Sequence, residues 1–124
     1  MRQLNIGICG LGTVGSGVLS VLQNNSDIIR EKSSCSIHVT HVATRNANHG
    51  CNVENIQFSK DIFEVARDSD IDLLVELIGG TSSALELIML AISNRKHVVT
   101  ANKALIAEHG TSILQAAYEA NVIV

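Results

Sequence analysis

The chain has 124 residues, a formal net charge of −3 at pH 7 and a hydrophobic fraction of 46%. This length suits one domain with a sizeable core, and nine basic residues scattered along an acidic chain argue against a nucleic-acid partner. No apolar run reaches the length of about eighteen residues that a membrane helix needs, and three cysteines without a CxxC pair favour a reducing cytoplasm.

The first half of the chain predicts two strands separated by a helix. An apolar run over 4–9 predicts a strand, and apolar side chains at helical spacing over 13–23 predict a helix. The polar stretch 24–36 predicts a loop or an extension of that helix. Alternating β-branched and polar side chains over 37–44 predict the second strand, and the asparagine-rich residues 45–55 predict a loop.

The middle of the chain predicts a further strand between two helices. A short strand is expected to end at Phe58, and a short helix is expected over 61–68. Residues 71–78 are strongly apolar and end at two glycines, which predicts a strand buried on both faces. Ser82 or Ser83 is the expected cap of the helix that follows.

The last part of the chain continues the alternation. We expect a strand over 97–100, helices over 102–108 and 111–120 that are broken at Gly110, and the start of another strand over 122–124. This order predicts an α/β fold with a doubly wound, mostly parallel sheet in three αβα layers. Because the chain stops inside an apolar run, we expect it to be one domain of a longer protein.

A glycine fingerprint joins the first strand to the first helix. The sequence Gly10-Leu11-Gly12-Thr13-Val14-Gly15 has the GxGxxG spacing of a dinucleotide-binding Rossmann fold. Gly10 permits a tight turn, Gly12 lets a pyrophosphate approach the backbone, and Gly15 lets the helix pack closely. The N–H groups of Thr13, Val14 and Gly15 would face the phosphates. The alternative is a tight turn in a flavodoxin-like domain that binds no nucleotide.

The residues after the second strand bear on the choice of cofactor. NAD sites place a carboxylate there to bind the ribose hydroxyls, but this strand is followed by Arg45 and no carboxylate occurs before Glu54. A guanidinium suits a 2′-phosphate, so NADP is favoured slightly over NAD. Lys60 is a second candidate for the same phosphate. The alternative for Arg45 is a solvated loop cation.

Two charged residues and the histidines complete the candidates. Glu76 lies in an apolar strand, where it either reaches the functional edge of the sheet or caps nearby backbone N–H groups, and we favour the structural role. Lys103 opens a helix at the same edge, where it could contact the nicotinamide ribose or a substrate. The five histidines have no metal-ligand spacing, and no metal site is expected. Cys9 is expected to be a buried packing thiol.

Three blocks of sequence together resemble one enzyme family. They are GLGTVGSGV over 10–18, VELIGGT over 75–81 and KHVVTANKALIAEHG over 96–110. These blocks resemble the N-terminal NAD(P)-binding domain of homoserine dehydrogenase, and the likeness covers nearly the whole chain in order. The resemblance therefore implies that residues 1–124 form one Rossmann domain and that the catalytic domain is absent from this chain.

The resemblance also assigns expected cofactor contacts. Lys103 would lie near the nicotinamide and the reacting carbon, where it would assist catalysis. Arg45 would contact the adenosine ribose or its phosphate, and Thr81 and Thr100 would lie along the nicotinamide. The residues expected to contact the pyrophosphate are Gly10, Gly12, Thr13, Val14 and Gly15.

The family transfers a hydride between nicotinamide C4 and L-homoserine or L-aspartate 4-semialdehyde, in the pathway to threonine, methionine and isoleucine. The resemblance implies that the main catalytic lysine belongs to the absent domain, so this chain would bind NADP or NAD without turnover. A homodimer is expected for the full-length enzyme and a monomer for this chain. The alternatives are a nucleotide-sensing domain of the kind that gates potassium channels, and another dehydrogenase with a similar first domain.

Overall fold

The computed structural model describes residues 2–45 and 56–124, and the loop expected over 45–55 lies outside them except for Arg45. The described residues form one five-stranded parallel sheet with the strand order β3-β2-β1-β4-β5. The strands are β1 Arg2–Cys9, β2 Cys35–Ala43, β3 Gln57–Ser59, β4 Leu73–Glu76 and β5 His97–Thr100.

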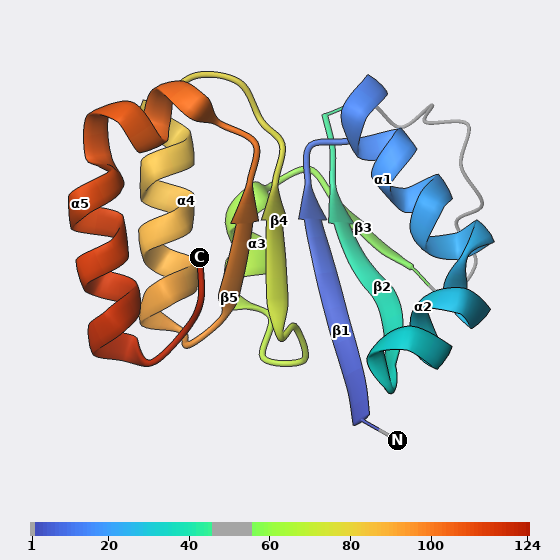
Figure 1. Ribbon diagram of the computed structural model, residues 1–124. Helices are drawn as coiled ribbons and strands as arrows, with labels where there is room; N and C mark the ends of the chain where they lie inside the picture. The colour runs from blue at the N-terminus through green and yellow to red at the C-terminus, as the bar shows by residue number, and fades with distance from the viewer. Residues whose placement is uncertain (1, 46–55) are drawn as a thin grey trace.

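Helices cover both faces of the sheet, which confirms the predicted three-layer α/β fold (Figure 1). Figure 1 shows α1 and α2 on one side and α4 and α5 on the other. Helix α3 packs against α4. No helix in the described ranges is long and apolar enough to span a membrane. The helices are α1 Thr13–Asn24, α2 Ser26–Ser33, α3 Ile62–Arg67, α4 Ser82–Ser93 and α5 Lys103–Ala120.

The second half of the central strand β1, from Ile6 to Cys9, is buried on both faces, as a covered parallel sheet requires. Ile6 and Ile8 pack with Leu19 of α1 in one apolar cluster. Cys9 points to the opposite face, into the cluster built from α3, α4 and α5. Gly7 also faces that side, where an added Cβ would lie 2.3 Å from a methyl group of Val65. The aliphatic composition thus supplies two cores, one on each face of the sheet.

The topology places a crevice at the carboxyl ends of β1 and β4. From β1 the chain passes to β2 on one side, and it later returns to β4 on the other side. The connection that follows β1 and the connection that follows β4 therefore cover opposite faces of the sheet. In open α/β sheets, such a switch point is where ligands bind.

The predicted break at Gly110 is wrong, because α5 runs without interruption from Lys103 to Ala120. Gly110 is buried, and Leu105, Ile113 and Ala117 lie buried along the same helix. A glycine inside a helix costs about 1 kcal/mol relative to alanine. Burial of these apolar side chains contributes more than that cost, so tertiary packing overrides the local preference.

Several other boundaries differ from expectation. The stretch 24–36, expected as a loop or an extension of the first helix, contains a separate helix α2 over Ser26–Ser33, and β2 begins two residues early, at Cys35. The strand predicted over 71–78 is shorter, because Ile71 closes a turn onto the Asp68 carbonyl and the chain leaves the ladder after Glu76. Thr81, rather than either serine, holds the N-cap position of α4. Residues 122–124 form no strand, although the Val98 N–H donates to the carbonyl of Ile123.

Candidate functional site

The turn between β1 and α1 is built so tightly that two of its positions accept only glycine. Gly10 has φ +100°, and a Cβ there would lie 2.8 Å from the Leu77 carbonyl oxygen. At Gly15 an added Cβ would lie 2.1 Å from the carbonyl oxygen of Gly10. The first turn of α1 therefore packs directly on the turn that follows β1, as the fingerprint predicts.

Gly12 differs from these two glycines because its space is open. Within residues 2–45 and 56–124, a Cβ at Gly12 would meet no described heavy atom within 4 Å, and its φ of −86° is accessible to any residue. No contact in this part of the chain therefore requires glycine at this position. The open face above Gly12 is the space that a bound group approaching the backbone would use.

Gly12 also occupies the N-cap position of α1, and among the described residues no side-chain hydrogen bond caps this helix at its start. The first N–H groups of a helix have no partner within the helix, and they carry the positive end of its dipole. At α1 these groups belong to Thr13, Val14 and Gly15. Val14 is exposed, whereas the side chain of Thr13 lies outside the described structure. This arrangement suits a phosphate group.

A pocket of about 660 Å³ opens beside this turn. It brings two of the expected glycines together with Arg45, and it adds Lys60 from the end of β3. The lining residues are Gly10, Leu11, Gly12, Ala43, Thr44, Arg45, Lys60, Asp61, Ile62, Phe63, Ile78, Gly79 and Ser83.

The two cations of the pocket follow neighbouring strands. Arg45 comes after β2 and Lys60 after β3, and the Thr44 N–H donates to the Ser59 carbonyl at 2.9 Å. This bond aligns the ends of the two strands, so both exposed cations border the same pocket. The nearby Asp61 carboxylate caps α3 by accepting from the Phe63 N–H at 2.9 Å.

Three residues that line the pocket were not predicted from the sequence as part of a site. Ile62 and Phe63 come from α3 and Ser83 from α4, and all three line the pocket. Their signal was present, because helices that follow parallel strands begin at the ligand-binding edge of the sheet. Ile62 is partly buried and also packs against the core.

The remaining expected contacts form a second group, outside this pocket. Thr81 precedes α4, Thr100 ends β5 and Lys103 begins α5. Lys103 is exposed at the first helical position. These residues lie at the carboxyl ends of β4 and β5, beside the switch point.

Glu76 ends β4 as a fully buried carboxylate. Its Oε2 atom accepts from the Ile78 N–H at 3.0 Å, and its Oε1 atom accepts from the Thr100 hydroxyl at 2.6 Å. The favoured structural role is confirmed, since Glu76 caps a nearby backbone N–H. Desolvation together with the charges of Glu76 and Asp61 raises the pKa of the Cys9 thiol to about 12, consistent with a buried packing residue.

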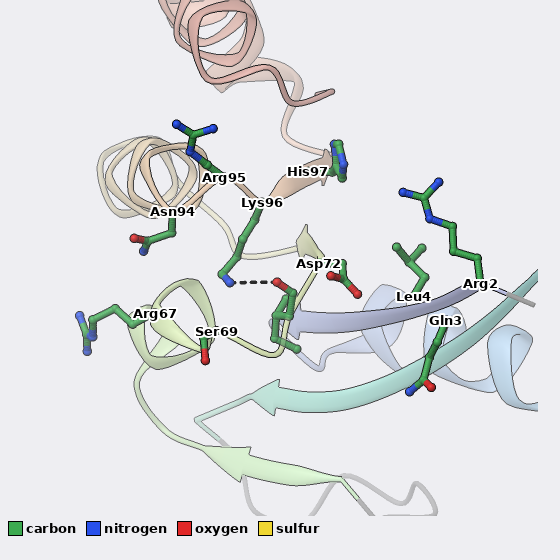
Figure 2. A pocket seen from close by; sticks show the side chains of 11 residues that line it. Arg2, Gln3, Leu4, Arg67, Ser69, Asp72, Asn94, Arg95, Lys96 and His97 are labelled. Carbon is green, nitrogen blue, oxygen red and sulfur yellow. Dashed lines mark hydrogen bonds between the residues drawn. The ribbon is translucent and has the colours of Figure 1, made fainter.

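A basic pocket of about 390 Å³ lies at the opposite edge of the sheet. There the buried Lys96 donates its ammonium to the carbonyls of Ile71, at 2.9 Å, and Asp68. Figure 2 shows the guanidinium groups of Arg67 and Arg95 turned away from that ammonium. Lys96 therefore joins two chain segments within the fold, and this pocket is separate from the glycine turn.

Comparisons with known proteins agree with this geometry. The family model described as "Homoserine dehydrogenase, NAD binding domain" matches residues 10–124. Homoserine dehydrogenase from Pseudomonas aeruginosa is 48% identical over 124 residues, covering all of this chain and 29% of that protein. Homoserine dehydrogenase from Neisseria gonorrhoeae is 42% identical over 127 residues, again with 100% and 29% coverage.

Solved structures give the same result. The homoserine dehydrogenase of Thiobacillus denitrificans superimposes with a TM-score of 0.90 at 41% identity, over 100% of this chain and 29% of that chain. The S. aureus homoserine dehydrogenase at pH 7.0 gives a TM-score of 0.89 at 33% identity, with 99% and 32% coverage. The chain therefore spans less than a third of the length of these relatives.

Proposed function

The chain belongs to the homoserine dehydrogenase family, as its NAD-binding domain, and from this membership we propose that it binds the dinucleotide for hydride transfer between L-homoserine and L-aspartate 4-semialdehyde. The nicotinamide supplies the hydride chemistry when it is bound. The protein contributes binding and orientation. The alternative of a nucleotide sensor is not favoured, because these relatives are homoserine dehydrogenases.

The observation that carries this proposal is the contrast between Gly12 and the other two fingerprint glycines. Gly10 and Gly15 are required by contacts within the turn, whereas a Cβ at Gly12 would project into open space. Open space beside the first N–H groups of a helix fits a pyrophosphate that approaches the backbone. The residues of the turn therefore suit the cofactor that the family uses.

Titration of the purified chain with NADPH, NADH and ATP tests this function. The fluorescence of the reduced nicotinamide reports binding directly, and competition by ATP reports binding of the adenosine part alone. We expect saturable binding of at least one reduced dinucleotide with higher affinity than ATP. Binding of ATP in preference to both dinucleotides would support the nucleotide sensor and overturn the proposal.

We further propose that NADP is preferred over NAD. Arg45 and Lys60 border one pocket beside the glycine turn, and together they offer two positive charges where an NAD site would place a carboxylate. A 2′-phosphate would be held by charge-assisted hydrogen bonds, with the guanidinium able to bind two of its oxygens. The cofactor preference follows from this pair.

The catalytic part of the proposal rests on Lys103. Its exposed ammonium at the first position of α5 would approach the nicotinamide and assist the reaction from the nucleotide side. We assign the lysine that moves the substrate hydroxyl proton to the part of the relatives that this chain does not span. The chain alone is then a monomer that binds cofactor without turnover, and the full-length enzyme is a dimer. Size-exclusion chromatography with light scattering tests the first of these states.

A further inference from the structure

A closed circuit of hydrogen bonds joins the loop after β4 to the loop after β5. Glu76 begins this circuit, because its two carboxylate oxygens accept from the Ile78 N–H and from the Thr100 hydroxyl. These partners lie on different segments, the first in the loop after β4 and the second at the end of β5. Glu76 and Thr100 are also direct partners in the register of the two strands.

Asn102 closes the circuit from the other side. Its backbone N–H donates to the Thr100 hydroxyl oxygen at 3.0 Å, and its side-chain amide donates to the carbonyl of Gly80. The amide oxygen of the same side chain accepts from the Leu105 N–H at 3.1 Å and so caps α5. The start of α5 is thereby bound to the loop that leads into α4.

Burying the Glu76 carboxylate has a desolvation cost, which the interactions of the carboxylate must offset. The carboxylate is 0% exposed, and within residues 2–45 and 56–124 no cation lies within ion-pair distance of it. Its direct hydrogen-bond donors are a backbone amide and a hydroxyl. An apolar residue would pack at this position without the desolvation cost of a carboxylate. What a carboxylate provides here, and an apolar residue would not, is the pair of hydrogen bonds that links the two loops.

The hydroxyl of Thr100 is already engaged within this circuit. It gives its one proton to Glu76 and accepts the Asn102 N–H, so it has no proton left to donate to a bound cofactor. A direct hydrogen bond from this hydroxyl to the nicotinamide would have to break the bond to Glu76. The side chain is therefore better suited to holding the loops than to binding the cofactor.

We propose that Glu76, Thr100 and Asn102 are positioning residues that fix the spacing of the two loops carrying Thr81 and Lys103, and so preform the subsite for the nicotinamide half of the dinucleotide. This inference rests on the proposed function. It assigns the adenosine half to the glycine turn and to Arg45 and Lys60, none of which makes a hydrogen bond of the circuit, although Ile78 and Gly79 of the loop after β4 also border that pocket. Loss of the circuit should therefore weaken binding of the nicotinamide half more than binding of the adenosine half.

A pair of ligands separates this role from general stabilisation. NADPH contains the nicotinamide, whereas 2′-phospho-ADP-ribose contains the rest of the molecule and lacks it. In the 124-residue chain, Thr100→Val removes the hydroxyl at nearly constant volume, and Thr100→Ser retains it. We expect Thr100→Val to weaken NADPH by about fivefold, the equivalent of one lost hydrogen bond, and to change 2′-phospho-ADP-ribose by less than about twofold. Thr100→Ser should restore NADPH affinity.

Asn102→Ser is a second variant that tests the same role if Thr100→Val fails to fold. Serine keeps an oxygen that caps α5 but lacks the amide that bonds to Gly80. We expect the same selective loss of NADPH affinity, with a thermal unfolding midpoint close to that of the unmodified chain.

Equal weakening of both ligands, or no weakening of either, would overturn the positioning role while leaving the proposed function intact. If the unmodified chain binds neither ligand, the proposed function fails and the positioning role fails with it. The two failures are therefore distinguished by the unmodified chain alone.

Discussion

The Nδ1 atom of His41 lies 2.8 Å from a carboxylate oxygen of Asp68, which joins the second strand to the residue that ends α3. The other ring nitrogen hydrogen-bonds the Ser59 hydroxyl at 2.7 Å. His41 is only 1% exposed, so both polar atoms of a buried ring are satisfied. This side chain thereby ties β2, β3 and α3 together on the face away from α1.

Asp68 makes the stability of the chain dependent on pH. Partial burial alone would raise the pKa of Asp68, but hydrogen bonds from the Asp70 N–H and from His41, with the charges of His41 and Lys96, outweigh it and lower the pKa. A lowered pKa in the folded state stabilises the protein above the ordinary pKa of about 3.9, and this contribution is lost as the pH falls through the folded value.

Asp68→Asn should therefore cost about 1–2 kcal/mol of unfolding free energy at pH 7, and the difference from the unmodified chain should shrink as the pH falls below about 4, the ordinary pKa of an aspartate. Urea denaturation at a series of pH values measures it. Asp27→Asn is the matched control, because Asp27 is 88% exposed and forms its ion pair with a helical neighbour, Arg30. A difference that stays constant with pH would contradict the assigned role of the carboxylate.

Alanine at Gly12 and at Gly15 should separate binding from folding. At Gly12 the methyl group enters open space, so we expect a stability change within about 1 kcal/mol and at least a tenfold loss of NADPH affinity. At Gly15 the methyl group meets the Gly10 carbonyl oxygen, so stability should fall by about 1–3 kcal/mol or more. Thermal unfolding and NADPH titration of both variants measure the contrast. Retention of full NADPH affinity in Gly12→Ala would argue that the cofactor lies elsewhere.

Arg45→Ala should weaken NADPH much more than NADH. Loss of a charge-assisted contact to phosphate is worth about 1.5–3 kcal/mol, which corresponds to at least tenfold in affinity. Lys60→Ala should act in the same direction with a smaller effect, because lysine contacts phosphate as a point charge. Titrations of both nucleotides test this, with Lys32→Ala on α2 as the control for lost positive charge. Equal losses for the two nucleotides would remove the assignment to the 2′-phosphate.

The sequence predicted the parts of this fold that depend on local pattern. The glycine turn was predictable because its constraints lie within the six residues of the fingerprint. The strands β1 and β5 were predictable from short apolar runs. The continuity of α5 through Gly110 was not predictable in this way, because it depends on burial against α4.

The same limit applies to the polar residues. The structural role of Glu76 was predictable because a carboxylate inside an apolar strand needs hydrogen-bond donors close by. Asp68, the partner of His41, and the two carbonyl groups bound by Lys96 lie 25 to 28 residues away in the sequence. No local pattern encodes such contacts. Likewise, the convergence of Arg45 and Lys60 on one pocket depends on the parallel pairing of β2 and β3.

Cys9 should resist alkylation in the folded protein. Its thiol is fully buried, it contacts the Ile62 carbonyl at 3.6 Å, and its raised pKa of about 12 leaves almost no thiolate at pH 8. Cys35 is half-buried and provides the comparison within the same sample. Iodoacetamide labelling at pH 8 followed by peptide mass spectrometry should show Cys35 modified and Cys9 protected until denaturant is added. Rapid labelling of Cys9 without denaturant would show that the core around β1 opens readily.

Gly110→Ala should stabilise the chain. Gly110 lies inside the continuous helix α5, where a Cβ would approach the nearest heavy atom, a methyl carbon of Ile106, at an ordinary contact distance of 3.4 Å. Alanine is favoured over glycine in a helix interior by about 0.5–1 kcal/mol, mainly because it restricts the unfolded chain. We expect a rise of a few degrees in the thermal unfolding midpoint with unchanged NADPH affinity. A lower midpoint would show that the helix needs the flexibility of glycine at this position, as the predicted break implied.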